Sequence, residues 1–113
     1  SAERKTEEAI SHYKIAIKLK PDYAPTYNNL GGALLDERQT EEAISNFKMA
    51  IKLKPDYAPA HYNLGNALLA IRETEEAISY YRMAIELKPD LAINNQRPIL
   101  ICAGQRRRCL LFD

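Results

Sequence analysis

With 113 residues, of which 46% are hydrophobic and 27% charged, the chain has the composition of a soluble globular protein and can bury a modest core. A formal net charge of +1 creates no field that would indicate a nucleic-acid or membrane partner. No apolar run approaches the roughly 20 residues of a membrane span, and no signal-peptide pattern opens the chain. The chain has only two cysteines, and nothing demands an oxidising compartment, so the cytoplasm is the default location. Ser1 in place of an initiating Met indicates an excised or processed fragment.

The dominant feature of the sequence is an internal repeat of 34 residues. Alignment of residues 7–40 with residues 41–74 gives 24 identities in 34 positions. Three prolines keep the same step along the chain: Pro21, Pro55 and Pro89. A fixed period of this length is the signature of stacked repeats, and it places an array at residues 1–92. This array divides into a half repeat and two full repeats: 1–21, 22–55 and 56–89.

Each repeat ends with a predicted helix that starts at the segment TEEAI, and we call it the second helix of the repeat. It is also the first predicted element in chain order, because the array begins with a half repeat. Thr6, Thr40 and Thr74 are candidate N-caps for it, and the two glutamates after each threonine favour the positive end of a helix dipole. In the first full repeat the apolar positions follow helical spacing: Ala43, Ile44, Phe47, Ala50 and Ile51. A proline follows each of these helices and prevents its continuation.

The next predicted element is a first helix, between each Pro-Asp pair and the following TEEAI. Asp22 and Asp56 are candidate N-caps, because a carboxylate can accept the unpaired amide hydrogens of a first turn. Pro25 and Pro59 then fall in that turn, where a missing N–H costs little. The apolar positions again follow helical spacing: Tyr27, Leu30, Ala33 and Leu34, then His61, Leu64, Ala67 and Leu68.

Small residues predict a close approach between the two helices of each repeat. Gly31 and Gly65 lie on the first helices, and Ala43 and Ala77 lie on the second helices. A single helix pair cannot bury both of its apolar faces, so neighbouring pairs are expected to stack. The sequence therefore predicts an all-α fold, a right-handed α-solenoid of helix-turn-helix repeats.

The last segment, residues 93–113, does not continue the repeat. Pro98 interrupts any helix, and the stretch ILICAG is strand-like or irregular. Cys102 and Cys109 are separated by six residues, which is not the spacing of a zinc or redox pair, so we expect inert thiols. This tail carries four Arg and one Asp, whereas the array carries 12 Lys and Arg against 14 Asp and Glu. It is interpreted as a foreign or altered sequence, or as a divergent cap.

The array resembles the tetratricopeptide repeat family over residues 6–92. The residues that carry the resemblance are an aromatic, Leu-Gly, Ala, a second aromatic, Ala and Pro: Tyr27, Leu30, Gly31, Ala43, Phe47, Ala50 and Pro55, then His61, Leu64, Gly65, Ala77, Tyr81, Ala84 and Pro89. The half repeat matches through Ala9, Tyr13, Ala16 and Pro21. Two departures stand out. Arg38 and Arg72 replace the usual turn glycine, and His61 occupies a position normally held by Trp or Tyr.

In this family the first helices line a concave groove that binds peptides, mainly extended ones, so the resemblance implies such a groove here. Asn29 and Asn63, each just before a Leu-Gly, resemble the asparagine ladder in superhelical arrays of O-linked N-acetylglucosamine transferases (O-GlcNAc transferases). An amide side chain can donate to and accept from a peptide backbone of any sequence. The alternative is that these asparagines are simply tolerated at the surface.

Further residues are expected on the same groove, and Leu35 and Leu69 among them fit an inter-repeat core equally well. These further residues are Asn28, Gly32, Leu35 and Asp36, then Tyr62, Asn66, Leu69 and Ala70. A family rival is the carboxylate clamp that holds acidic chaperone tails, which needs Lys or Arg on the first helices. Residues 24–37 and 58–71 contain neither, which argues against a clamp.

Nothing in the sequence indicates catalysis or a cofactor. There is no Gly-rich phosphate loop, no metal-ligand spacing on a helix and no nucleophile–base pair. His61 is expected to pack in place of an aromatic ring, and His12 to lie at the surface. The lysines of the second helices are interpreted as a solvated convex face: Lys14, Lys18, Lys48 and Lys52.

We therefore expect a non-catalytic scaffold that binds an extended peptide of a partner protein in its concave groove, with no nucleic-acid or membrane partner. One alternative is a substrate-recognition fragment of a larger glycosyltransferase. Another is an engineered or structural fragment that self-associates. Both ends of the array should expose apolar surface, which predicts homo-oligomerisation through the uncapped ends or a tail that folds back over one of them.

Overall fold

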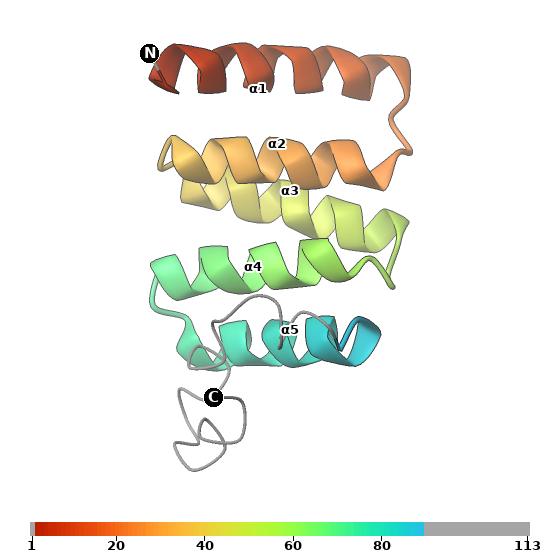
Figure 1. The fold of residues 1–113 in the computed structure, drawn as a ribbon, viewed down its shortest axis with the longest axis vertical. Helices are drawn as coiled ribbons and strands as arrows, with labels where there is room; N and C mark the ends of the chain where they lie inside the picture. The colour runs from red at the N-terminus through yellow and green to blue at the C-terminus, as the bar shows by residue number, and fades with distance from the viewer. Residues whose placement is uncertain (1, 90–113) are drawn as a thin grey trace.

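The computed structural model describes residues 2–89, and the predictions for the tail lie outside the described residues. The described part of the chain contains helices and no strands, which confirms the predicted all-α solenoid. Its five helices run in chain order as α1 (Ala2–Leu19), α2 (Ala24–Asp36), α3 (Thr40–Leu53), α4 (Ala58–Ala70) and α5 (Thr74–Leu87). The first helices of the repeats are α2 and α4, and the second helices are α1, α3 and α5 (Figure 1).

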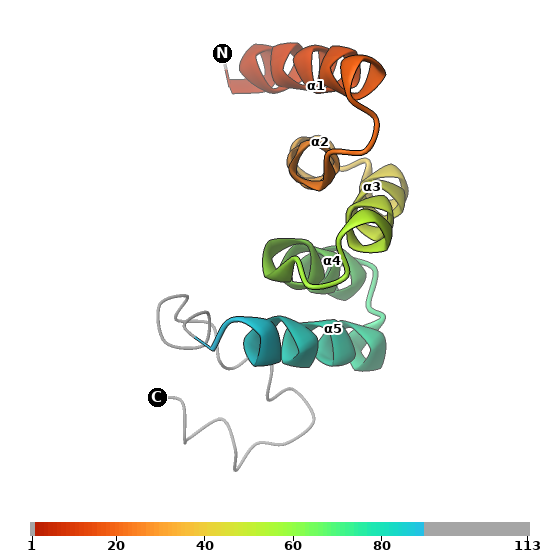
Figure 2. The same ribbon diagram turned by 90° about the vertical axis from the view of Figure 1, so that its right-hand side faces the viewer.

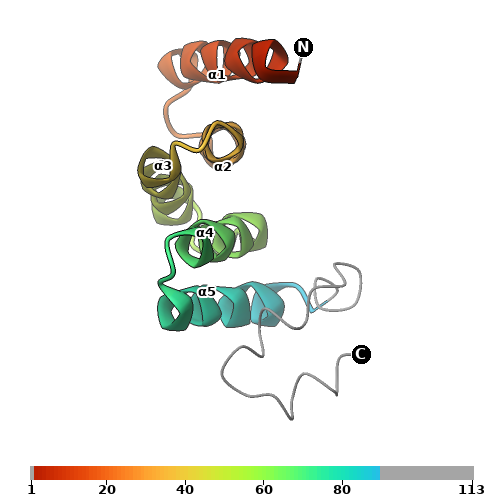
Figure 3. The same ribbon diagram turned by 90° about the vertical axis from the view of Figure 1, so that its left-hand side faces the viewer.

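The helices stack one after another along the long axis of the molecule (Figure 1). The most extensive contacts join α2 to α3 and α4 to α5, so each full repeat is a packed helix pair. Contacts between α1 and α2 and between α3 and α4 connect the successive repeats. The two side views show α2 and α4 displaced to one side of the stack and α3 to the other (Figures 2 and 3). The two first helices therefore lie next to each other on one face.

The core lies inside the helix pairs and between them. Its largest fully buried side chains are Leu34, Phe47, Leu64 and Tyr81. A Cβ atom placed on Gly31 would lie 2.5 Å from the ring of Phe47, and one on Gly65 would lie 2.7 Å from the ring of Tyr81. Only a glycine lets the first helix approach the aromatic ring of the second helix this closely, which confirms the predicted close approach.

The two arginines that replace the turn glycine hold a left-handed backbone, with φ of 64° at Arg38 and 67° at Arg72. Around Arg38, Gln39 N–H donates to Leu34 C=O at 2.9 Å and Arg38 N–H donates to Leu35 C=O at 3.0 Å. The same two bonds, at 2.9 and 3.0 Å, surround Arg72. This is the Schellman motif that ends a helix on a left-handed residue. The turn thus keeps the geometry that a glycine would adopt without strain.

The threonine N-cap predictions are wrong. Thr40 and Thr74 are the first residues of α3 and α5, and Thr6 lies inside α1. The N-cap positions belong to Gln39 and Glu73, and neither makes a side-chain capping bond. The reason is the preceding turn. Each N-cap residue also closes the Schellman motif of the helix before it, so one residue ends one helix and starts the next.

The aspartate N-cap predictions are wrong as well. The N-cap residues of α2 and α4 are Tyr23 and Tyr57, again without a side-chain capping bond. The chain is still turning at Asp22, because Tyr23 N–H donates to Lys20 C=O at 3.4 Å, and the helix begins after this turn. The same turn surrounds Asp56. The prolines that follow do lie in the first helical turn, as predicted.

Candidate functional site

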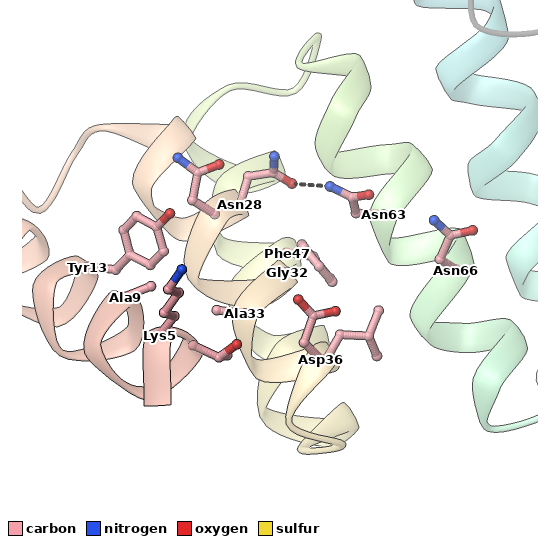
Figure 4. Close-up of a pocket in the computed structure, with 13 residues that line it drawn as sticks. Lys5, Ala9, Tyr13, Asn28, Gly32, Ala33, Asp36, Phe47, Asn63 and Asn66 are labelled. Atoms are coloured by element: carbon pink, nitrogen blue, oxygen red, sulfur yellow. Dashed lines mark hydrogen bonds between the residues drawn. The ribbon is translucent and has the colours of Figure 1, made fainter. Parts of the chain in front are cut away.

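A cavity of about 570 Å³ opens on the face that the first helices share (Figure 4). Side chains from α1, α2 and α4 surround it, and one aromatic ring from α3 reaches it. Its lining residues are Lys5, Thr6, Ala9, Tyr13, Asn28, Asn29, Gly32, Ala33, Leu35, Asp36, Phe47, Asn63 and Asn66. A volume of several hundred Å³ is typical of ligand sites. The cavity is therefore the candidate functional site of the described residues.

The repeat accounts for one pair of the asparagines in this cavity, Asn29 and Asn63, whereas the equivalents of Asn28 and Asn66 are Tyr62 and Gly32. Residues one repeat apart occupy equivalent places on α2 and α4, and the two helices are neighbours. Asn63 on α4 reaches across to α2 and donates through Nδ2 to Oδ1 of Asn28 at 3.0 Å (Figure 4). Asn28 is buried and Asn63 is half-buried. The bond ties the two first helices together at the wall of the cavity and holds both amides in place.

The amide of Asn66 is fixed by a hydrogen bond from a core residue. The hydroxyl of Tyr81 donates to Oδ1 of Asn66 at 2.5 Å, and the rings of Tyr81 and Tyr62 lie 5.5 Å apart. Asn66 lies one helical turn beyond Asn63 on the same face of α4. With Oδ1 of Asn66 occupied by Tyr81, its Nδ2 is the group that a ligand carbonyl can reach.

The structure brings five of the six predicted site residues together around the cavity. Asn29 and Asp36 are exposed on α2, and they line it with the three asparagines described above. Tyr62 is not among the lining residues, because it packs against Tyr81. Leu35 and Leu69 both pack against the core and remain half-buried, and Leu35 also lines the cavity.

Sequence reasoning missed the contribution of α1 to the cavity. Lys5, Thr6, Ala9 and Tyr13 form one of its walls (Figure 4). The signal was present in the repeat, since Ala9 and Tyr13 are the equivalents of two second-helix positions that face a first helix. Lys5 and Asp36 are the charged lining residues, so the cavity offers one cation and one anion rather than a cluster of either sign.

His61 packs in place of an aromatic ring, as predicted. It is buried, and its ring lies 5.9 Å from that of Tyr80. Its Nε2 lies 2.8 Å from the carbonyl oxygen of Pro55, where it must donate because a carbonyl only accepts. One repeat earlier, the hydroxyl of Tyr27 donates to the carbonyl of Pro21 at 2.7 Å. Histidine and tyrosine thus make the same bond to the preceding turn.

Two further observations concern the described residues as a whole. No cluster of three or more His, Cys, Asp and Glu side chains that could hold a metal ion occurs between residues 2 and 89. Within the same range, no helix combines the length and the apolar character needed to cross a membrane. His12 lies exposed on α1, as the sequence predicted.

Stacked helix pairs around a shared cavity define the class of α-helical repeat proteins that present a groove. The chain belongs to the tetratricopeptide repeat family: the family model described as Tetratricopeptide repeat matches residues 28–92, and one described as TPR repeat matches residues 4–37. Among curated protein sequences, none matches this chain.

Several solved structures share the fold. The first TPR of Spaghetti (RPAP3) bound to the HSP90 peptide SRMEEVD is 25% identical, with a TM-score of 0.76 over 95% of this chain and 79% of that one. MamA is 27% identical, with a TM-score of 0.81 over 95% of this chain and 64% of its own. The TPR2B-domain:pHsp70-complex of yeast Sti1 is 23% identical, with a TM-score of 0.73 over 98% and 82%, and it shows the fold alone.

Proposed function

We propose that the chain is a non-catalytic interaction scaffold that binds an extended peptide of another protein in the cavity between α2 and α4. The observation that carries the proposal is the set of amides on the cavity wall: Asn28, Asn29, Asn63 and Asn66. Amides pair with the N–H and C=O groups that every peptide backbone repeats. The similar RPAP3 domain supports the proposal because its structure holds an HSP90 peptide.

The charges of the cavity favour a peptide of low net charge over an acidic one. An acidic tail needs several cations within reach of its carboxylates. The cavity provides one lysine, Lys5, and the carboxylate of Asp36 opposes further negative charge. We propose on this ground that the peptide is held by its backbone and by apolar contacts with residues such as Leu35. The alternative function, substrate recognition within a larger glycosyltransferase, would use the same contacts. For the location of the chain, we propose the cytoplasm as the default.

The test is a random-sequence peptide array, followed by calorimetry of the best binders with two asparagine variants. Asn66→Ala removes one of the amides that line the cavity, and we expect binding to weaken by about three- to tenfold, the value of one hydrogen bond. The matched control is Asn46→Ala, because the Asn46 amide donates to the Glu42 carbonyl on α3, away from the cavity. Equal affinities for the two variants would contradict the proposal, as would an array on which acidic peptides bind best.

A further inference from the structure

The first helices α2 and α4 differ at two positions on the face that they share. Where α4 has Asn66, α2 has Gly32, and where α4 has Ala70, α2 has Asp36. Gly32 and Asp36 both line the cavity (Figure 4). Compared with α4, helix α2 therefore replaces an amide with open space and a methyl group with a carboxylate. The two differences fall in one place, because residues four apart lie on the same face of a helix.

The first difference is the open space at Gly32. A Cβ atom placed on this glycine would have no contact within 4 Å. On α4, Asn66 occupies the equivalent space and accepts a hydrogen bond from the hydroxyl of Tyr81, whereas Phe47, the equivalent of Tyr81, has no hydroxyl to donate. The position stays accessible when another first helix precedes it, since Asn66 lines the cavity although α2 comes before α4. The space is therefore a property of α2 itself.

The second difference is the carboxylate of Asp36, which lies one helical turn beyond Gly32. Asp36 is exposed and, within residues 2–89, forms no ion pair with Lys5 on the α1 wall or with any other cation. Between the open space and the carboxylate lies Leu35, which is half-buried, packs against the core and also lines the cavity. This side of the cavity thus offers space, an apolar surface and a negative charge side by side.

We propose that Gly32, Leu35 and Asp36 form a basic-residue pocket, which binds a lysine or arginine side chain of the peptide in the groove. The inference rests on the proposed function and names a side chain that the peptide carries. The aliphatic stem of a basic side chain lies over Gly32 and against Leu35, and its charged end pairs with the carboxylate of Asp36. A purely apolar side chain fits less well, because it would remove water from the carboxylate without offering it a partner.

The basic-residue pocket also determines how the peptide lies in the groove. The equivalent positions on α4 hold Asn66 and Ala70, which leave neither the space nor the charge. Among the first helices of residues 2–89, only α2 therefore carries such a pocket. Amides that pair with a peptide backbone accept any register, whereas a single pocket for one basic side chain selects one register.

The test uses a short host peptide of alternating Ala and Ser, blocked at both ends, with one central guest residue. NMR titration measures its affinity for the full chain with Arg, Gln or Leu as the guest. We expect the Arg peptide to bind about three- to fivefold more tightly than the Gln peptide at low salt, the value of one partly exposed ion pair. The preference should shrink at high salt, because dissolved ions screen exposed charges.

Two pairs of chain variants locate the preference. Asp36→Asn keeps the shape of the side chain but removes its charge, and it should bring the Arg and Gln peptides to equal affinity. Its control is Asp56→Asn, because Asp56 is exposed in the turn before α4 and does not line the cavity. Gly32→Leu fills the space for the stem and should also remove the preference, whereas Ser45→Leu, exposed on α3, should keep it. Circular dichroism checks that all four variants stay folded.

The outcomes distinguish the basic-residue pocket from the groove that contains it. The pocket proposal is overturned if the Arg and Gln peptides bind the unmodified chain equally, if the Leu peptide binds best, or if Asp36→Asn keeps the preference for Arg. The groove proposal survives each of these results when Asn66→Ala still weakens the binding of all three peptides. If none of the three peptides binds the chain, neither proposal holds.

Discussion

Two copies of the second helix, α1 and α3, differ more in the burial of their side chains than in their sequence. Ala43 and Phe47 on α3 are completely buried, while their equivalents Ala9 and Tyr13 on α1 remain half-buried. The residue types are nearly the same, and the difference comes from the neighbouring helix. In a linear stack the energy of a residue depends on whether the next helix is present. The same motif is thus fully buried where a first helix of its own repeat covers it, and half-buried on α1, for which the described residues contain no such helix.

The largest expected effect comes from deleting the equivalent ring in each region. Phe47→Ala removes a fully buried ring and should lower the free energy of unfolding by about 3–5 kcal/mol, enough to unfold much of the chain. Tyr13→Ala removes a half-buried ring and should cost about 1 kcal/mol. Urea unfolding followed by circular dichroism measures both variants. Equal losses would mean that α1 is as well covered as α3, and the contrast between the regions would fail.

A smaller effect tests whether the contact between α2 and the ring of Phe47 requires a glycine at position 31. Gly31→Ala pushes a methyl group into the ring of Phe47 and should destabilise the chain by about 1–3 kcal/mol. Gly32→Ala meets no neighbour and should stabilise α2 by up to about 1 kcal/mol, because alanine is the better helix former. The melting temperatures of the two variants should therefore move in opposite directions. A shift of the same sign in both would show that the ring of Phe47 relaxes freely.

Much of this fold could be predicted from the sequence, because the 34-residue period fixes helix order, stacking and the glycine–aromatic contacts. The predictions failed at the helix starts. Asp22 and Thr40 are good N-cap residues by type, but the turns before α2 and α3 set the first helical residue. That is a constraint between neighbouring helices, and residue preferences do not contain it.

The candidate site could be predicted only in part, because the repeat places residues on a face but does not determine their side-chain contacts. Asparagines on the first helices could be placed on a shared face from the repeat alone. The sequence could not show that the amide of Asn63 donates a hydrogen bond to Asn28, nor that the ring of Tyr62 packs against Tyr81. These contacts depend on side-chain choices that the repeat leaves open. The wall from α1 was missed because a half repeat has no groove helix of its own.

The smallest effect tests whether the turns of the two full repeats are equivalent in energy as well as in geometry. Arg38 and Arg72 hold the same left-handed conformation in the two repeats, with the same pair of closing bonds. Replacing either with glycine relieves the strain of a side chain at positive φ, so Arg38→Gly and Arg72→Gly should each stabilise the chain by about 1 kcal/mol. Thermal denaturation of the two single variants should give equal rises in melting temperature. Unequal rises would show that the turns of the two full repeats differ in energy, despite their equal backbone geometry.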